Sequence, residues 1–158
     1  MDELLEIDAI KRLKYRYMRC LDQKRWTELA DCFTEDATTS YGDGKYAFTG
    51  RDAILRFLSE AMGRPSFLSS HRVHHPEIEL DGPASARGTW ALEDFVIDPE
   101  RRVIIQGAAF YEDAYAKTAG RWRIRATGYR RTFELVEPLD ARPGLRLTAG
   151  LPSAAPHA

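Results

Sequence analysis

The sequence predicts an α+β domain in which helices pack on one face of a curved antiparallel sheet. Two observations carry this prediction. Apolar residues recur with helical spacing near the N-terminus, and four long strand-like runs separated by turn residues fill most of the remaining chain. Helices on one face of such a sheet enclose a cone, and apolar walls would make its interior a pocket for a small molecule.

Three helices and a hairpin are expected in the N-terminal part of the chain. Residues 4–22 carry one apolar stripe, formed by Leu4, Ile7, Ile10, Leu13, Tyr17 and Leu21. A shorter helix is expected around "WTELADCF", and another over "RDAILRFLSEAMG", closed by Gly63. Between these two helices, "DATTSYGDGKYAFTG" has turn residues flanked by Thr, Tyr and Phe, which is typical of a hairpin.

The second half of the chain predicts a meander. Its strand-like runs are 68–80, 84–97, 103–117 and 121–136. "DGP", "DPER" and "TAGR" separate them and are good turn material. The runs are long for strands, so we expect strong curvature with bulges, one of them near Pro76. We assign residues 1–138 to one domain and residues 139–158, which have little periodicity, to a C-terminal tail.

Composition narrows the class of protein. The chain has 158 residues, 44% of them hydrophobic, and its 23 basic and 24 acidic residues give a net charge of -1. This balance argues against a nucleic-acid partner. "MDELLEIDAI" has no signal-type apolar core, and no apolar run is long enough to span a bilayer. Without a signal peptide, Cys20 and Cys32 are expected to be reduced thiols in a cytoplasmic protein.

Three histidines lie close together in "SHRVHHPEIELDG". Strand alternation places His71 and His75 on one face and His74 on the other, so the three cannot all ligate one ion. No Cys or His elsewhere completes an obvious metal set, and no metal is expected. Two interpretations remain: all three are surface or structural histidines, or one of them faces the cavity and transfers protons.

Two charged pairs raise the question of which side chain faces inward. In "TWALEDFVI", Glu93 and Asp94 interrupt an apolar strand, so one carboxylate is expected to face the interior and to need a cationic partner. Asp94 shares its face with Trp90, but periodicity alone does not choose, and an edge strand with both acids near water is the alternative. In "GYRRTF" the same question applies to Arg130 and Arg131, with an exposed salt bridge as the alternative.

The first helix supplies two more candidates. Tyr17 lies on its apolar stripe and is either a core aromatic or a cavity group. Asp22 follows the stripe and is either an inward carboxylate or an N-cap of the next helix. A tyrosine, carboxylates, a histidine and an arginine in an apolar chamber suit proton abstraction next to a carbonyl. The chain has no phosphate-binding glycine motif and no Gly-x-Ser-x-Gly elbow, and no cofactor is expected.

Six segments in order resemble one family. They are "YMRCLDQKRWTELA", "SYGDGKYAF", "HRVHHPEIELDG", "GTWALEDFVI", "QGAAFYEDAY" and "GRWRIRATGYRRTFE". From about Ile10 through Phe133 the chain resembles the SnoaL-like branch of the NTF2-like superfamily and, within it, the bacterial bile acid 7α-dehydratases. The resemblance implies the NTF2-like cone and a homo-oligomer, with a trimer favoured. The tail and Arg130 depart from the family pattern.

The resemblance also implies a set of active-site residues, matched in type by Tyr17, Asp22, His71, Asp94 and Arg131. It implies a cofactor-independent dehydratase that removes water from a hydroxy-ketone steroid or a similar polycyclic substrate. Tyr17 would bind the ketone oxygen, and His71 would remove the proton while Asp22 or Asp94 orients it. Arg131, His74 and Trp90 are the expected substrate-binding residues.

Two other functions are compatible with this type of fold, because fold does not define function. One is a ketosteroid isomerase-like enzyme, against which the combination of His71 and Asp94 argues. The other is a non-catalytic small-molecule-binding domain, like the small subunits of ring-hydroxylating dioxygenases. Such domains usually lack the complete polar set, so that set favours the dehydratase.

Overall fold

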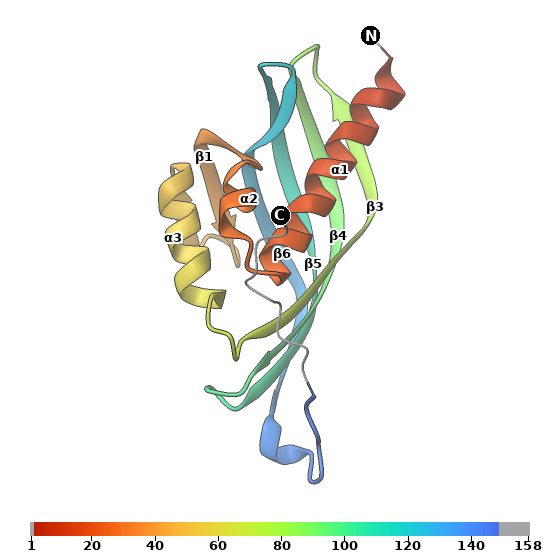
Figure 1. The fold of residues 1–158 in the computed structure, drawn as a ribbon. Coiled ribbons are helices and arrows are strands. Elements are labelled where there is room, and N and C mark those ends of the chain that lie inside the picture. The colour runs from red at the N-terminus through yellow and green to blue at the C-terminus, as the bar shows by residue number, and fades with distance from the viewer. Residues whose placement is uncertain (1, 149–158) are drawn as a thin grey trace.

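The computed structural model describes residues 2–148, in which three α-helices pack on one six-stranded sheet (Figure 1). The α-helices are α1 (Glu3–Asp22), α2 (Trp26–Ala30) and α3 (Arg51–Met62). The strands are β1 (Phe33–Tyr41), β2 (Tyr46–Thr49), β3 (Leu68–Leu80), β4 (Ser85–Asp98), β5 (Val103–Thr118) and β6 (Arg121–Pro138). A short 3-10 helix, η1, covers Leu139–Ala141. The predicted α+β class is therefore confirmed.

Most predicted elements agree with the structure within two residues. The second helix is shorter than expected, because it ends at Ala30 and Phe33 already begins β1. The hairpin is formed by β1 and β2, and its turn places Gly42, Asp43 and Gly44 at positive φ. Glycine and aspartate tolerate this left-handed backbone better than most residues, which is why "GDG" marked the turn. The predicted tail extends beyond the described residues from position 149 onward.

The sheet has the order β2-β1-β6-β5-β4-β3 and contains one parallel pair. Strands β3 to β6 form the expected antiparallel meander. β1 pairs antiparallel with β2 but parallel with β6, so the sheet is mixed rather than wholly antiparallel. The chain reaches β6 only after α3 and four further strands, and a connection of that length permits parallel pairing. The long strands curve, and the sheet does not close into a barrel.

Three bulges in the β3–β6 meander set which side chains face the helices. The β3–β4 register shifts between His74 and Glu77, where His75 has a φ of 47°, so the irregularity expected near Pro76 is confirmed. The β5–β6 register shifts twice: Arg131 and Phe133 pair with successive residues of β5, and so do Ile124 and Ala126. Each bulge adds one residue to a strand and resets its alternation.

The core lies between α1 and the concave face of the sheet (Figure 1). The inner stripe of α1 packs against inward side chains of the strands, among them Trp90, Leu92, Tyr111 and Ile124. This burial supplies most of the favourable free energy of folding. Within residues 2–148, no helix is long and apolar enough to cross a membrane.

Candidate active site

The C-terminal end of α1 meets β3 through Asp22 and His71. Asp22 Oδ1 lies 2.7 Å from His71 Nδ1, and Oδ2 accepts a 2.8 Å hydrogen bond from the His71 backbone N–H. Ser69 Oγ donates to Oδ1 at 2.8 Å. Because a carboxylate can only accept, Nδ1 carries the proton and Nε2 is left as the basic nitrogen. Asp22 is thus not the N-cap of α2, a position held by Arg25.

Asp94 lies on the same face of the sheet as His71. The two are Cα partners in neighbouring antiparallel strands, which places their Cβ atoms about 5 Å apart. Asp94 is 6% exposed, whereas the Glu93 side chain points to the other face and is 67% exposed. The structure thereby distinguishes the two carboxylates that periodicity left equivalent.

Arg131 pairs with Asp94 through both terminal guanidinium nitrogens. Nη2 donates to Oδ2 at 2.8 Å, and Nη1 donates to Oδ1. These hydrogen bonds raise the pKa of the Arg131 guanidinium, so it stays a cation. Its neighbour Arg130 points outward, is 86% exposed and lies 3.9 Å from Asp43. Of the two arginines, only Arg131 joins the group around His71.

Gly107 makes room for the Arg131 side chain. A Cβ atom built on Gly107, the β5 partner of Asp94, would lie 2.5 Å from Arg131 Nη1 and 3.0 Å from the Phe133 carbonyl oxygen. One neighbour is backbone and the other is fixed in a bidentate pair, so neither can move at low cost. The sequence segment "QGAAFY" contains this residue, but nothing in its periodicity marks it.

We expect Gly107→Ala to lower the free energy of unfolding by about 1–3 kcal/mol, the usual cost of adding a methyl group where there is no room for it. The added methyl group would displace the Arg131 guanidinium from Asp94. Urea unfolding curves of the variant and of the unmodified protein would check this. An unchanged free energy of unfolding would contradict the close approach of Arg131 to Gly107.

Tyr17 belongs to a cluster of buried tyrosines. Its hydroxyl lies 2.9 Å from the Tyr41 hydroxyl, and burial raises the pKa of both phenols well above the usual value. The Tyr129 ring lies 5.6 Å from the Tyr41 ring, and the Arg131 guanidinium is 5.1 Å from the Tyr129 ring. These contacts connect Tyr17 with the Asp94–Arg131 pair. Sequence reasoning missed Tyr41 and Tyr129, although both follow the inward alternation of their strands.

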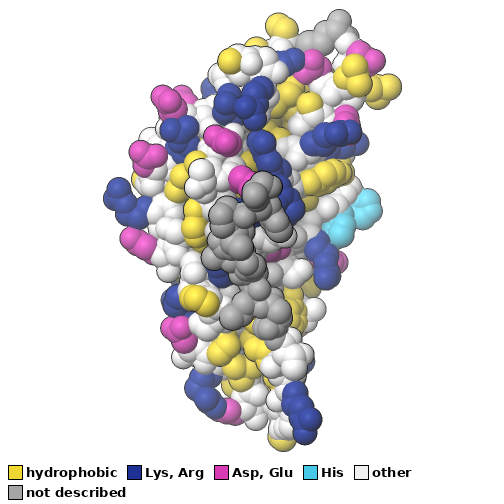
Figure 2. Space-filling view, viewed as in Figure 1, with side chains coloured by type: hydrophobic (Ala, Val, Ile, Leu, Met, Phe, Trp, Pro, Cys, Tyr) yellow, Lys and Arg dark blue, Asp and Glu magenta, His cyan; other side chains and the backbone are white. Residues whose placement is uncertain are grey.

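The structure does not bring the other two expected substrate-binding residues into this group. His74 is on the opposite face of β3, 40% exposed, with Nε2 3.6 Å from Glu93 Oε2. Histidine side chains do reach the surface along the β3 edge (Figure 2). Trp90 faces inward, but its Nε1 donates to Tyr115 Oη at 2.8 Å and so belongs to the cluster around Asp113 rather than to the group around His71. We therefore leave both residues out of the candidate site.

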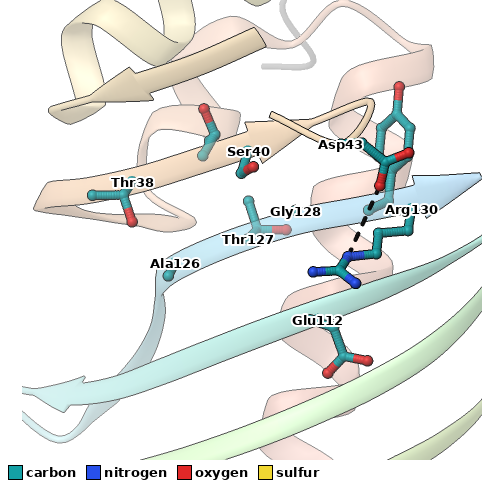
Figure 3. Close-up of a pocket in the computed structure, with 10 residues that line it drawn as sticks. Thr38, Ser40, Asp43, Glu112, Ala126, Thr127, Gly128 and Arg130 are labelled. Atoms are coloured by element: carbon teal, nitrogen blue, oxygen red, sulfur yellow. Dashed lines mark ion pairs between the residues drawn. The ribbon is translucent and has the colours of Figure 1, made fainter. Parts of the chain in front are cut away.

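A wide hollow of about 840 Å³ lies away from this group. Thr38, Ser40, Glu112 and Arg130 line it, and α1 lies behind the sheet from this side (Figure 3). The hollow is therefore on the outer face and contains none of the groups bonded to His71 or Asp94. We therefore locate the candidate site from the hydrogen bonds of His71 and Asp94 and not from the shape of the surface. Within residues 2–148, no three His, Cys, Asp or Glu side chains gather as metal ligands.

The fold and this inward polar group define a class of protein. Residues 2–128 match the family of the SnoaL-like domain. The chain therefore belongs to the SnoaL-like family, with the NTF2-like cone as its fold.

Two solved structures share the fold over nearly the whole chain, and a further protein is similar in sequence. A provisionally assigned scytalone dehydratase from Novosphingobium aromaticivorans is 25% identical, with a TM-score of 0.77 and coverage of 98% of this chain and 97% of that one. A hexachlorocyclohexane dehydrochlorinase, LinA type 3 from Novosphingobium barchaimii, is 18% identical, with a TM-score of 0.78 and coverage of 94% and 97%. The uncharacterized protein Rv2910c of Mycobacterium tuberculosis is 26% identical over 121 residues, covering 73% of this chain and 78% of its own.

Proposed function

We propose that this protein is a cofactor-independent hydro-lyase that removes water from a hydroxy ketone, with His71 as the base. The observation that carries the proposal is the Asp22–His71 pair, which leaves Nε2 as the proton acceptor. Asp94 and Arg131 lie on the same inward face. Similarity to proteins described as a dehydratase and a dehydrochlorinase adds support, because both names describe an elimination.

The reaction follows from these groups. His71 Nε2 takes a proton from the carbon activated by the ketone, and the electron pair shifts to the ketone oxygen. Tyr17 donates a hydrogen bond to that oxygen. Tyr41 can donate its own hydroxyl proton to Tyr17 Oη, which leaves the Tyr17 proton free for the ketone oxygen. The electron pair then returns, the C–OH bond breaks, and the departing hydroxide takes the proton from Nε2. Water leaves and His71 is neutral again.

We propose a steroid-like substrate with a 7α-hydroxy-3-oxo-4-ene unit. In such a molecule the proton on C6 is vinylogous to the ketone, and the hydroxyl on C7 is the leaving group. The resemblance to bile acid 7α-dehydratases supports this choice. The rings of Tyr17, Tyr41, Tyr111 and Tyr129 pack together inside the fold, and an aromatic wall of this kind would suit a rigid apolar ring system.

Mass spectrometry of the product tests the proposal. The purified protein, without added cofactor, is mixed with the 7α-hydroxy-3-oxo-4-ene steroid. The dehydratase is expected to release product lighter by one water. A ketosteroid isomerase-like enzyme would change the steroid without changing its mass. An unchanged steroid that still binds would identify a binding domain, and either of these results would contradict the proposal.

Asp94→Asn is expected to lower turnover at least about ten-fold, whereas Glu93→Gln stays within about two-fold. The asparagine keeps the size of the side chain but removes the charge that holds Arg131 in a bidentate pair. Glu93 is the matched control, because it is the next residue on the same strand and faces outward. Equal kcat values for the two variants would exclude Asp94 from the site.

We also propose that the protein is a homotrimer, as the family resemblance implies. Phe110, Phe133 and Leu135 are at least half exposed, and Phe133 and Leu135 line a hollow beside Phe95. Burial of such side chains would favour self-association. Sedimentation equilibrium is expected to give the mass of three chains, and Phe133→Glu is expected to lower it. A monomer mass for the unmodified chain would contradict the assembly but not the chemistry.

A further inference from the structure

A second polar cluster lies beside the tyrosines, and the elimination described above does not use it. Lys14 of α1 and Asp113 of β5 form an ion pair in which Nζ lies 2.7 Å from Oδ2. Both side chains are 0% exposed. Complete burial of two charges is costly, because neither keeps its hydration.

The carboxylate of this pair is fixed from the sheet side. Asp113 Oδ1 accepts a 2.6 Å hydrogen bond from Thr127 Oγ1, and Oδ2 accepts a 2.7 Å bond from Tyr115 Oη. Tyr115 Oη in turn accepts from Trp90 Nε1 at 2.8 Å. These bonds anchor the negative end of the pair in β5 and β6.

The ammonium of the pair faces the tyrosines. Lys14 Nζ lies 3.5 Å from the centroid of the Tyr111 ring and 5.0 Å from that of Tyr17. Among the described residues the contacts of Nζ are the Asp113 carboxylate and the two rings. Burial lowers the pKa of Lys14, and the charge of Asp113 opposes that shift. The positive end of the pair therefore points toward the phenol that would hold the ketone oxygen.

Stability alone is a weak reason for a buried ion pair. Replacing a buried ion pair by uncharged side chains of similar volume is often neutral or stabilising. A fixed dipole in a site of low dielectric, in contrast, interacts strongly with a charge that develops nearby. The position of the pair beside Tyr17 therefore indicates an electrostatic role at the site.

We propose that Lys14 is a positioning residue of the candidate site, forming with Asp113 a fixed dipole that acts through Tyr17 to stabilise negative charge on the ligand oxygen. The inference rests on the proposed function for its catalytic meaning. The preference for an oxyanion beside Tyr17 can nevertheless be measured without turnover.

The test compares two double variants that each remove one ion pair between α1 and β5. Lys14→Met/Asp113→Asn removes the pair beside the tyrosines and avoids leaving a single buried charge. The matched control is Glu6→Gln/Lys117→Met. Glu6 Oε1 and Lys117 Nζ lie 2.7 Å apart and join the same two elements, but Glu6 is in the first turn of α1, three turns before Tyr17. Thermal unfolding curves establish that both variants fold.

The probes are 4-nitrophenolate, whose oxyanion resembles an enolate, and nitrobenzene, which has no charge. Loss of 4-nitrophenolate binding in Tyr17→Phe would place the probe at Tyr17. The Lys14→Met/Asp113→Asn variant is expected to bind 4-nitrophenolate about ten-fold more weakly, with nitrobenzene binding unchanged and kcat lowered without a change in KM. The control variant is expected to match the unmodified protein in all four quantities.

Equal 4-nitrophenolate affinities in the two double variants would overturn the inference, as would no binding of this probe at Tyr17 in the unmodified protein. A selective loss of phenolate affinity in a protein that dehydrates no hydroxy ketone would support the dipole and refute the proposed reaction. The two proposals therefore fail by different measurements.

Discussion

Replacing His71 with alanine should lower kcat by about 10²–10⁴-fold, the contribution of a well-placed general base. The expected loss follows from the position of Nε2, the one ring nitrogen not bonded to Asp22. Binding of the steroid should change much less than kcat, because the aromatic wall stays intact. Initial rates over a range of substrate concentrations separate the two quantities.

His74→Ala is the matched control for this substitution. His74 lies three residues along the same strand but on the opposite face, beside Glu93. Its kcat should stay within about two-fold of the unmodified value, as for most surface substitutions. An equal loss in both variants would mean that the effect comes from β3 as a whole and not from the base.

Asp22→Asn should have the second large effect, also about 10²–10⁴-fold in kcat. The asparagine amide can donate a hydrogen bond to Nδ1, which moves the imidazole proton to Nε2 and removes the base. The carboxylate also holds the His71 backbone N–H and Ser69 Oγ. Kinetics combined with ¹⁵N NMR of the imidazole would detect both the loss of rate and the change of tautomer.

Asp8→Asn provides the control for that substitution. Asp8 lies on the same helix, but its side chain is exposed and accepts a 2.7 Å hydrogen bond from Arg12 instead of from His71. Its effect on kcat should be negligible. A fully active Asp22→Asn variant would contradict the role assigned to the pair.

The secondary structure could be predicted closely because its signals are local. The stripe of α1 and the turn residues between the long strands lie in short windows, and each agrees with the fold that forms. The parallel pairing of β1 with β6 could not be predicted in this way. It joins residues about 90 positions apart, such as Thr39 and Thr127, and no local pattern encodes that contact.

The candidate site was only partly accessible from the sequence. Strand alternation predicts that one residue of each adjacent charged pair faces the interior. Whether that residue is Glu93 or Asp94 depends on which face of β4 meets α1. The partner of Asp22 is 49 residues away, so the contact with His71 is purely tertiary. Lys14 did leave a signal, because a charged residue directly follows Leu13 on the buried side of an apolar stripe.

The absorbance of the extended dienone is the most direct measure of the central claim, that His71 removes a proton and water leaves without a cofactor. The unmodified protein, His71→Ala and His74→Ala are mixed in parallel with the 7α-hydroxy-3-oxo-4-ene steroid. The band should grow with the unmodified protein and with His74→Ala, and it should stay flat with His71→Ala. Growth of the band at an equal rate with His71→Ala would contradict that claim.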